Sequence, residues 1–125
     1  MSEKKRILLV DDDATVVSYL TTKLSKLYEV VATSDPRKAV ALARRDLPDA
    51  ILCDIDMPGM NGGEVAAALA EDTILARIPF IYLTELVSPQ EARDMQGYVS
   101  GKPAVAKRAP LQELVARIDE LAPGR

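Results

Sequence analysis

Polar side chains that could do chemistry stand directly after short apolar runs of this 125-residue chain: Asp11, Asp12, Asp54, Thr84 and Lys107. Apolar runs this short, bounded by polar residues and turn formers, are typical of strands buried on both faces of a parallel sheet. Because parallel strands end at one edge of a sheet, we expect these side chains to meet there, where open α/β sheets bind ligands. Each residue alone could equally be a solvated strand end. Their combination indicates a site.

The predicted cluster of Asp11, Asp12 and Asp54 favours a metal ion. Carboxylates within about 4 Å of one another repel by a few kcal/mol for each pair at the dielectric of a protein surface. A hard divalent cation relieves that repulsion, and Mg²⁺, which keeps several waters in an octahedral shell, suits a site with few carboxylates. We expect Lys107 to supply a positive charge on the other side of the site.

Composition excludes several classes of function. The net charge of −3 and the pI of about 5.0 argue against nonspecific nucleic-acid binding, which needs a basic face. No apolar run approaches the ~20 residues of a membrane span, and the basic N-terminus precedes too short an apolar stretch for a signal peptide. We therefore expect a cytoplasmic protein. The chain has no histidine, which excludes a Ser-His-Asp triad, imidazole zinc sites and an internal phosphohistidine.

Strands and helices alternate five times along the chain. The expected strands are Arg6–Val10, Glu29–Thr33, Ala50–Cys53, Ile78–Leu83 and Ala104–Ala106. The expected helices are Ala14–Leu27, Pro36 to about Asp46, Glu64–Glu71, Ser88 to about Met95, and Pro110–Leu121, while Gln96–Gly101 carries no clear signal. This order predicts a doubly wound α/β fold with a five-stranded parallel sheet and five flanking helices. We expect a single domain over residues 1–125, with an ordered core at about 5–122 and no output domain.

The chain resembles the receiver domain of response regulators in bacterial two-component signal transduction. The acidic pair after I-L-L-V, the D-x-x-M-P-G-M-x-G loop, the P-F-I-Y-L-T strand and the closing A-K…E-L-V-A-R-I segment match in order. The resemblance covers essentially the whole chain and implies the flavodoxin-like receiver fold.

The resemblance also implies a mechanism of signalling. Asp54 would accept a phosphoryl group from a sensor histidine kinase or a histidine phosphotransfer protein. Asp11, Asp12, Asp54 and the backbone carbonyl of Asp56 would hold Mg²⁺. An aspartate carboxylate can form an acyl phosphate, with the Thr84 hydroxyl and the Lys107 ammonium stabilising the transferred group. Output would pass through contacts with a downstream protein, without direct nucleic-acid or membrane binding. The sequence leaves open whether the chain forms a homodimer.

Two lysines compete for the family's last position. Lys102-Pro103 looks like the family's Lys-Pro pair, but Lys107 precedes the last helix in the family's register. We therefore assign Lys107 to the site and expect Lys102 to be a solvated loop residue. With this assignment, Arg108 replaces the family's usual proline.

Three departures support an alternative function. Glu85 replaces the small residue that usually follows the threonine, Ala104 replaces the family's switch aromatic, and Arg108 replaces the proline. A degenerate receiver, acting as a phosphorylation-independent interaction module, would tolerate all three. The intact Asp11, Asp12, Asp54, Thr84 and Lys107 favour the phosphoacceptor.

Two enzyme classes fit less well. Asp54-Ile55-Asp56 has the D-x-D spacing of haloacid-dehalogenase phosphatases, but those place it after the first strand, follow it with threonine and need a larger chain. A dinucleotide-binding fold would require glycines in the first strand-to-helix turn, where this chain has acids. We therefore do not expect an enzyme.

Overall fold

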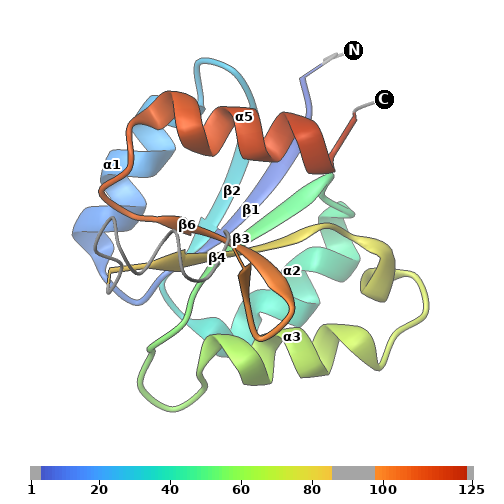
Figure 1. Cartoon of the computed structure of the whole chain (residues 1–125). Helices are drawn as coiled ribbons and strands as arrows, with labels where there is room; N and C mark the ends of the chain where they lie inside the picture. The colour runs from blue at the N-terminus through green and yellow to red at the C-terminus, as the bar shows by residue number, and fades with distance from the viewer. Residues whose placement is uncertain (1–3, 86–97, 124–125) are drawn as a thin grey trace.

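The computed structural model describes residues 4–85 and 98–123, and its sheet has the strand order β2-β1-β3-β4-β6-β5 (Figure 1). The strands are β1 (Arg6–Val10), β2 (Glu29–Thr33), β3 (Ala50–Asp54), β4 (Phe80–Thr84), β5 (Tyr98–Val99) and β6 (Lys102–Ala106). The helices are α1 (Ala14–Leu24), α2 (Ala39–Asp46), α3 (Gly62–Ala70) and α5 (Leu111–Leu121), with 3₁₀ turns η1 (Pro36–Lys38) and η2 (Leu75–Arg77). The predicted doubly wound α/β architecture is confirmed.

Each central strand contributes side chains to two hydrophobic cores, one on each face of the sheet, because successive side chains point to opposite faces. In β1, Ile7 and Leu9 pack with α1 and α5, whereas Leu8 and Val10 pack with α2 and α3. The strands β3 and β4 alternate in the same way. Figure 1 shows α1 and α5 on one side of the sheet and α2 and α3 on the other. Burial on both faces explains the unbroken apolar runs in the sequence.

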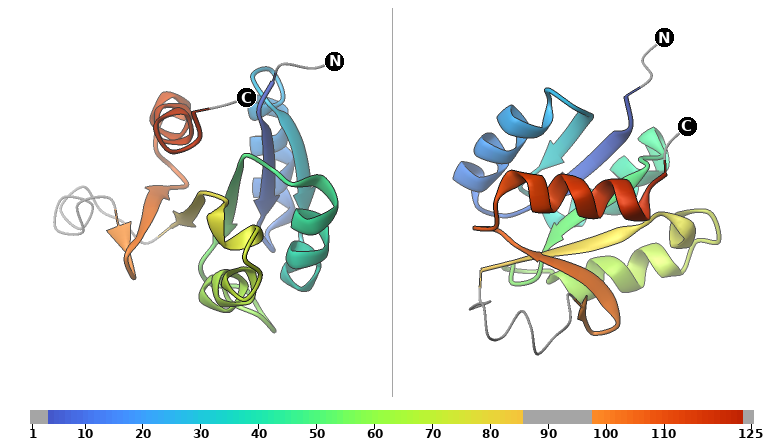
Figure 2. Two further views of the ribbon diagram at one scale, coloured as in Figure 1. Left: turned by 90° about the vertical axis from the view of Figure 1, so that its right-hand side faces the viewer. Right: turned by 45° about the horizontal axis from the view of Figure 1, so that its top comes forward.

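The sheet differs from the prediction at one edge, where β5 pairs antiparallel with β6 (Figure 2). The prediction of five parallel strands was therefore incomplete. Ser100 and Gly101 join the two strands with φ angles of 50° and 79°. Positive φ at both central residues is the requirement of a type I′ hairpin turn, which matches the twist of the flanking strands. Lys102, expected in a loop, begins β6, and its ammonium lies 5.6 Å from the centre of the Phe80 ring.

Several element boundaries also move. The helix expected to run to Leu27 ends at Leu24, so that Leu27 is 49% exposed and Tyr28 takes the buried position. The second helix begins as η1 and becomes α-helical only at Ala39. The helix predicted near Ser88–Met95 lies outside the described residues. Within the part of the chain that is described, no helix is long and apolar enough to span a bilayer.

Candidate functional site

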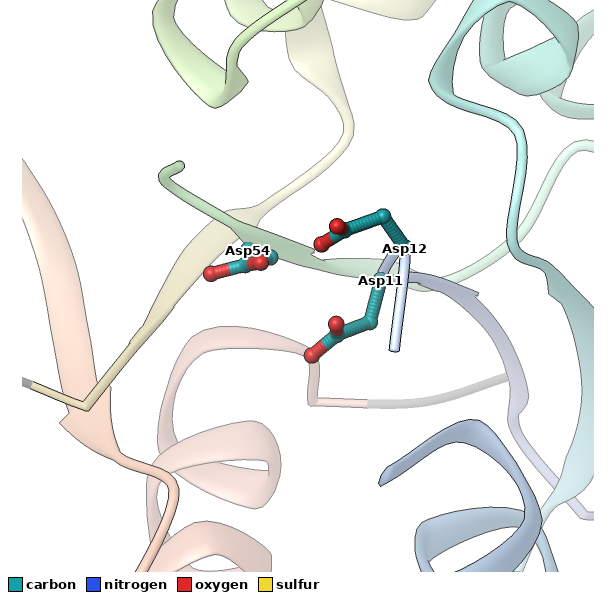
Figure 3. Close-up of side chains that lie close together, drawn as sticks. All are labelled: Asp11, Asp12 and Asp54. Carbon is teal, nitrogen blue, oxygen red and sulfur yellow. The ribbon is translucent and has the colours of Figure 1, made fainter. Parts of the chain in front are cut away.

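The chain reverses its winding direction between β1 and β3, which lie side by side at the centre of the sheet. The carboxyl ends of strands at such a point are where doubly wound folds bind ligands. Asp11 follows β1 directly and Asp54 is the last residue of β3, so both carboxylates emerge there. Figure 3 shows them together with Asp12.

These three aspartates form a tight acidic cluster. One carboxylate oxygen from each lies within 4.8 Å of the other two. Asp11 and Asp54 are buried, with 0% and 6% exposure, and Asp12 is exposed. The predicted grouping of Asp11, Asp12 and Asp54 is therefore present in the fold.

Backbone groups orient the two buried carboxylates. Asp11 accepts a hydrogen bond from the Asp13 N–H at 2.9 Å, and Asp54 Oδ1 accepts one from the Ile55 N–H at 2.8 Å. Asp13 in turn caps α1 by accepting from the Thr15 N–H at 2.9 Å. Both carboxylates are thus held by loop backbone that a strand or a capped helix fixes in place.

Lys107 is the cation of the site. Its Nζ lies 2.7 Å from Asp11 Oδ2 and 3.2 Å from Asp54 Oδ1, and its side chain is only 7% exposed. The Lys107 N–H also donates to the Thr84 carbonyl at 2.8 Å, which ties the end of β6 to the end of β4. The structure therefore places Lys107, rather than Lys102, beside the acidic cluster, as the register predicted.

The charges of the cluster perturb each other's pKa values. Burial, reinforced by the negative charge of Asp11 and opposed by Lys107, raises the pKa of Asp54 to about 6. Burial would lower the pKa of Lys107, but the hydrogen bond and charge of Asp11, followed by those of Asp54, outweigh it and raise that pKa. The Lys107 ammonium therefore stays charged, whereas burial disfavours the ionised form of Asp54.

The acidic cluster fits a magnesium ion. Apart from the Lys107 ammonium, Asp11 Oδ2 has no hydrogen-bond partner among the described residues, although it is fully buried. A buried anionic oxygen with one cationic neighbour and two nearby carboxylates is the donor set that a hard cation prefers. Asp56 lines the adjoining cavity, and its carbonyl stays a predicted ligand.

A polar cavity of about 230 Å³ opens beside the cluster. It is lined by the following residues: Asp12, Asp13, Asp54, Ile55, Asp56, Thr84, Glu85 and Lys107. Thr84 is 6% exposed at the end of β4, so that the predicted threonine does share the cavity with Asp54 and Lys107. Thr84 ends β4, Glu85 follows it directly, and Lys107 follows β6, so that the ends of four strands contribute to the cavity and its cluster.

Gly62 is a structural determinant of the Asp54 loop, and it begins α3 two residues before the helix expected from the sequence. A Cβ at this position would lie 2.3 Å from the Asp54 carbonyl oxygen and 3.0 Å from the Tyr82 ring. The Gly62 N–H also donates to the Ile55 carbonyl at 2.8 Å. Glycine in the first turn of a helix, where it is a poor helix former, was the available signal.

The comparisons with known proteins agree with this geometry. A family model, the response regulator receiver domain, matches residues 7–119. The response regulator PleD of Caulobacter vibrioides is 45% identical over 82 residues, which are 65% of this chain and 18% of PleD. Protein PilH of Pseudomonas aeruginosa is 41% identical over 80 residues, 63% of this chain and 66% of PilH. The aligned region is thus less than a fifth of PleD and about two thirds of PilH.

Solved structures are similar over nearly the whole chain. The receiver domain of the sensor histidine kinase PA1611 from Pseudomonas aeruginosa superposes with a TM-score of 0.80 at 27% identity, covering 97% of this chain and 99% of that one. That structure has a magnesium ion coordinated in its active site cleft. The Vibrio cholerae chemotaxis protein CheY4 superposes with a TM-score of 0.79 at 25% identity, covering 94% of this chain and 98% of CheY4.

Proposed function

Because the chain belongs to the response regulator receiver domain family of two-component systems, we propose that it accepts a phosphoryl group on Asp54. The observation that carries the proposal is that Asp54 lies in one cluster with Asp11 and Asp12 and that its carboxylate is 3.2 Å from the Lys107 ammonium. A carboxylate that adjoins both an acidic cluster suited to Mg²⁺ and a buried ammonium is placed to receive an anionic group.

The donor would be a phosphohistidine of a partner protein, since this chain has no histidine. In the transfer, an Asp54 oxygen forms a bond to phosphorus while the bond from phosphorus to the imidazole nitrogen breaks. The imidazole leaves with the electron pair of that bond. Asp54 Oδ1 is held by the Ile55 N–H and lies near Lys107, so we assign the attack to Oδ2. The product is an acyl phosphate.

The chain's own residues would position and stabilise this product. The Lys107 ammonium would pair with one phosphoryl oxygen, and the Thr84 hydroxyl would donate to another. Asp11 and Asp12, with the Asp56 carbonyl, would hold Mg²⁺, which when bound neutralises charge on the equatorial oxygens. The chain would then signal by contacts with another protein, as a regulator rather than an enzyme.

Intact mass after incubation with acetyl phosphate and Mg²⁺ tests the proposal. We expect the wild type to gain the mass of one phosphoryl group, and Asp54→Asn to gain none. Glu71→Gln is the matched control, because it removes an exposed carboxylate that does not line the cavity, and it should still be labelled. Equal labelling of wild type and Asp54→Asn would refute the assignment of Asp54.

The degenerate receiver remains the second candidate, and Glu85 is the observation that favours it. Its carboxylate lies 3.7 Å from Lys107 Nζ, where it competes for the charge that a phosphoryl group would use. A wild type that takes up no phosphoryl group from acetyl phosphate or from any phosphohistidine protein would favour this second function.

A further inference from the structure

Glu85 differs from the other two carboxylates beside Lys107 in its access to solvent. Asp11 and Asp54 have side-chain exposures of 0% and 9%, whereas that of Glu85 is 60%. An exposed carboxylate is hydrated wherever it points, so that it loses little when it leaves an ion pair. A buried carboxylate that lost its ammonium would remain uncompensated. Of the three partners of Lys107, Glu85 is therefore the one that can be exchanged.

The cavity offers an incoming anion little other positive charge. Its lining contains the carboxylates of Asp12, Asp13, Asp54, Asp56 and Glu85, with Lys107 as the only cationic side chain among its described residues. Asp13 and Asp56 repel an anion from a distance, but neither forms an ion pair with Lys107 in the described part of the chain. Glu85 alone both lines the cavity and contacts its ammonium from the solvent side.

We propose that Glu85 is a displaceable counter-ion of Lys107 that controls the binding of tetrahedral anions at Asp54. Without an anion, Glu85 contacts Lys107 from the mouth of the cavity. When an anion binds, it takes that contact and the Glu85 carboxylate turns to solvent. Glu85 is thus a positioning residue that lowers anion affinity, and it acts through Lys107. This inference rests on the proposed function of Asp54.

The test measures binding of beryllofluoride, a tetrahedral mimic of a phosphoryl group, in the presence of Mg²⁺ by ¹⁹F NMR titration. Glu85→Gln keeps the shape and removes the charge, and we expect it to bind about 3- to 10-fold more tightly than wild type. Increasing salt should reduce this ratio, because the contact is partly exposed. Glu71→Gln, an exposed carboxylate at the end of α3, is the matched control and should bind like wild type.

A double-mutant cycle separates exchange at Lys107 from simple repulsion. In a Lys107→Met background, Glu85→Gln should change the affinity less than 2-fold, because the ammonium for which Glu85 competes is gone. An equal gain in both backgrounds would overturn the displacement model. Glu85→Asp provides a second measurement, in case Lys107→Met does not fold: the shorter side chain keeps its charge but loses reach, and it should give a smaller gain than Glu85→Gln.

The outcomes distinguish this inference from the function on which it rests. If wild type binds beryllofluoride and Glu85→Gln binds it equally, the counter-ion model is wrong while Asp54 keeps its assignment. If neither protein binds it, the assignment of an anion site at Asp54 is wrong, and so is the proposed role of Glu85. Binding by Glu85→Gln alone would support the model at its strongest, because the counter-ion would then exclude the anion completely.

Discussion

The two ends of the sheet both concentrate charge, but they balance it differently. At the amino end, Arg6 lies 3.0 Å from Glu29, and its backbone N–H donates to Asp49 at 2.7 Å. Lys5 and the Tyr28 hydroxyl both donate to Asp119, at 2.9 and 3.0 Å. At the carboxyl end, three aspartates cluster, and one ammonium contacts two of them, Asp11 and Asp54. The matched, partly exposed pairs at the amino end hold elements together, whereas the partly buried cluster at the carboxyl end has excess negative charge that a cationic ligand could neutralise.

The largest difference between the two ends should appear in metal binding. Replacing Asp11 and Asp12 together with Asn should abolish the Mg²⁺-dependent changes in an NMR spectrum, since only one carboxylate of the cluster then remains. Asp119→Asn removes an acid from the amino end and should leave the Mg²⁺ response unchanged. A response that survives the double substitution would place the metal elsewhere and remove the basis of the comparison.

Removal of the shared cation should produce the next largest effect. Lys107→Ala leaves Asp11 and Asp54 buried without their ammonium, and we expect a loss of about 3–5 kcal/mol in the free energy of unfolding without metal. Added Mg²⁺ should restore part of that loss. Lys102→Ala removes the ammonium at the start of β6 and should cost less than about 1 kcal/mol. Urea unfolding with and without Mg²⁺ measures both variants, and the reverse ranking would show that Lys102 is the cation of the site.

Backbone crowding at the carboxyl end can be tested through two adjacent glycines. Gly62→Ala places a methyl group against the Asp54 carbonyl, and forcing the loop to move should cost about 1–3 kcal/mol in stability. Gly63→Ala meets the Asn61 side chain at 3.3 Å and the Tyr82 hydroxyl at 3.9 Å, and it should change stability by less than half as much. Comparable losses in thermal unfolding would show that the Asp54 loop is less tightly packed than the structure indicates.

The smallest expected effects have opposite pH dependence at the two ends. The raised pKa of Asp54, about 6, means that its ionised form costs stability above that pH, and the cost is relieved as the pH falls through 6. The hydrogen bond from Lys5 is the main cause that lowers the pKa of Asp119, so its contribution is present above pH 4 or so and is lost as the pH falls further.

Two substitutions measure these contributions in metal-free protein. At pH 8, Asp54→Asn should stabilise the fold by about 1–2 kcal/mol. Asp119→Asn should destabilise it by up to about 1 kcal/mol after solvent screening. Unfolding curves at pH 8 and pH 5 should show the Asp54→Asn gain shrinking at the lower pH. The same sign of effect for both variants would contradict the contrast between the ends.

The sequence predicted the features that depend on the central strands, namely the strand positions and the grouping of the polar residues that follow them. Unbroken apolar runs located β1, β3 and β4 to within two residues at each end, and because these strands are parallel their polar successors had to meet. The grouping of Asp11, Asp12, Asp54 and Lys107 followed from that topology. The hairpin at β5 was missed because a two-residue strand has no periodicity, and Ser100-Gly101 is a weaker turn signal than Asn-Gly.

The sequence could not predict contacts that depend on the exact distance between two elements. Whether Glu85 faced the cavity or solvent could not be decided from its position in the chain, and the structure shows both: an exposed side chain whose carboxylate contacts Lys107. The crowding at Gly62 likewise depends on how closely α3 approaches β3, which neither propensity nor pattern reports. Both features arise from the spacing between elements rather than from their order.

The ion pair between Asp11 and Lys107 joins residues that are 96 positions apart in the 125-residue sequence, and this has a consequence for biosynthesis. During translation β1, β2, β3 and β4 are synthesised before β6. Until then, the growing chain carries the buried aspartates of β1 and β3 without their ammonium. The site is therefore completed only once Lys107 has been synthesised, and a chain truncated before Lys107 would keep Asp11 and Asp54 without their ammonium.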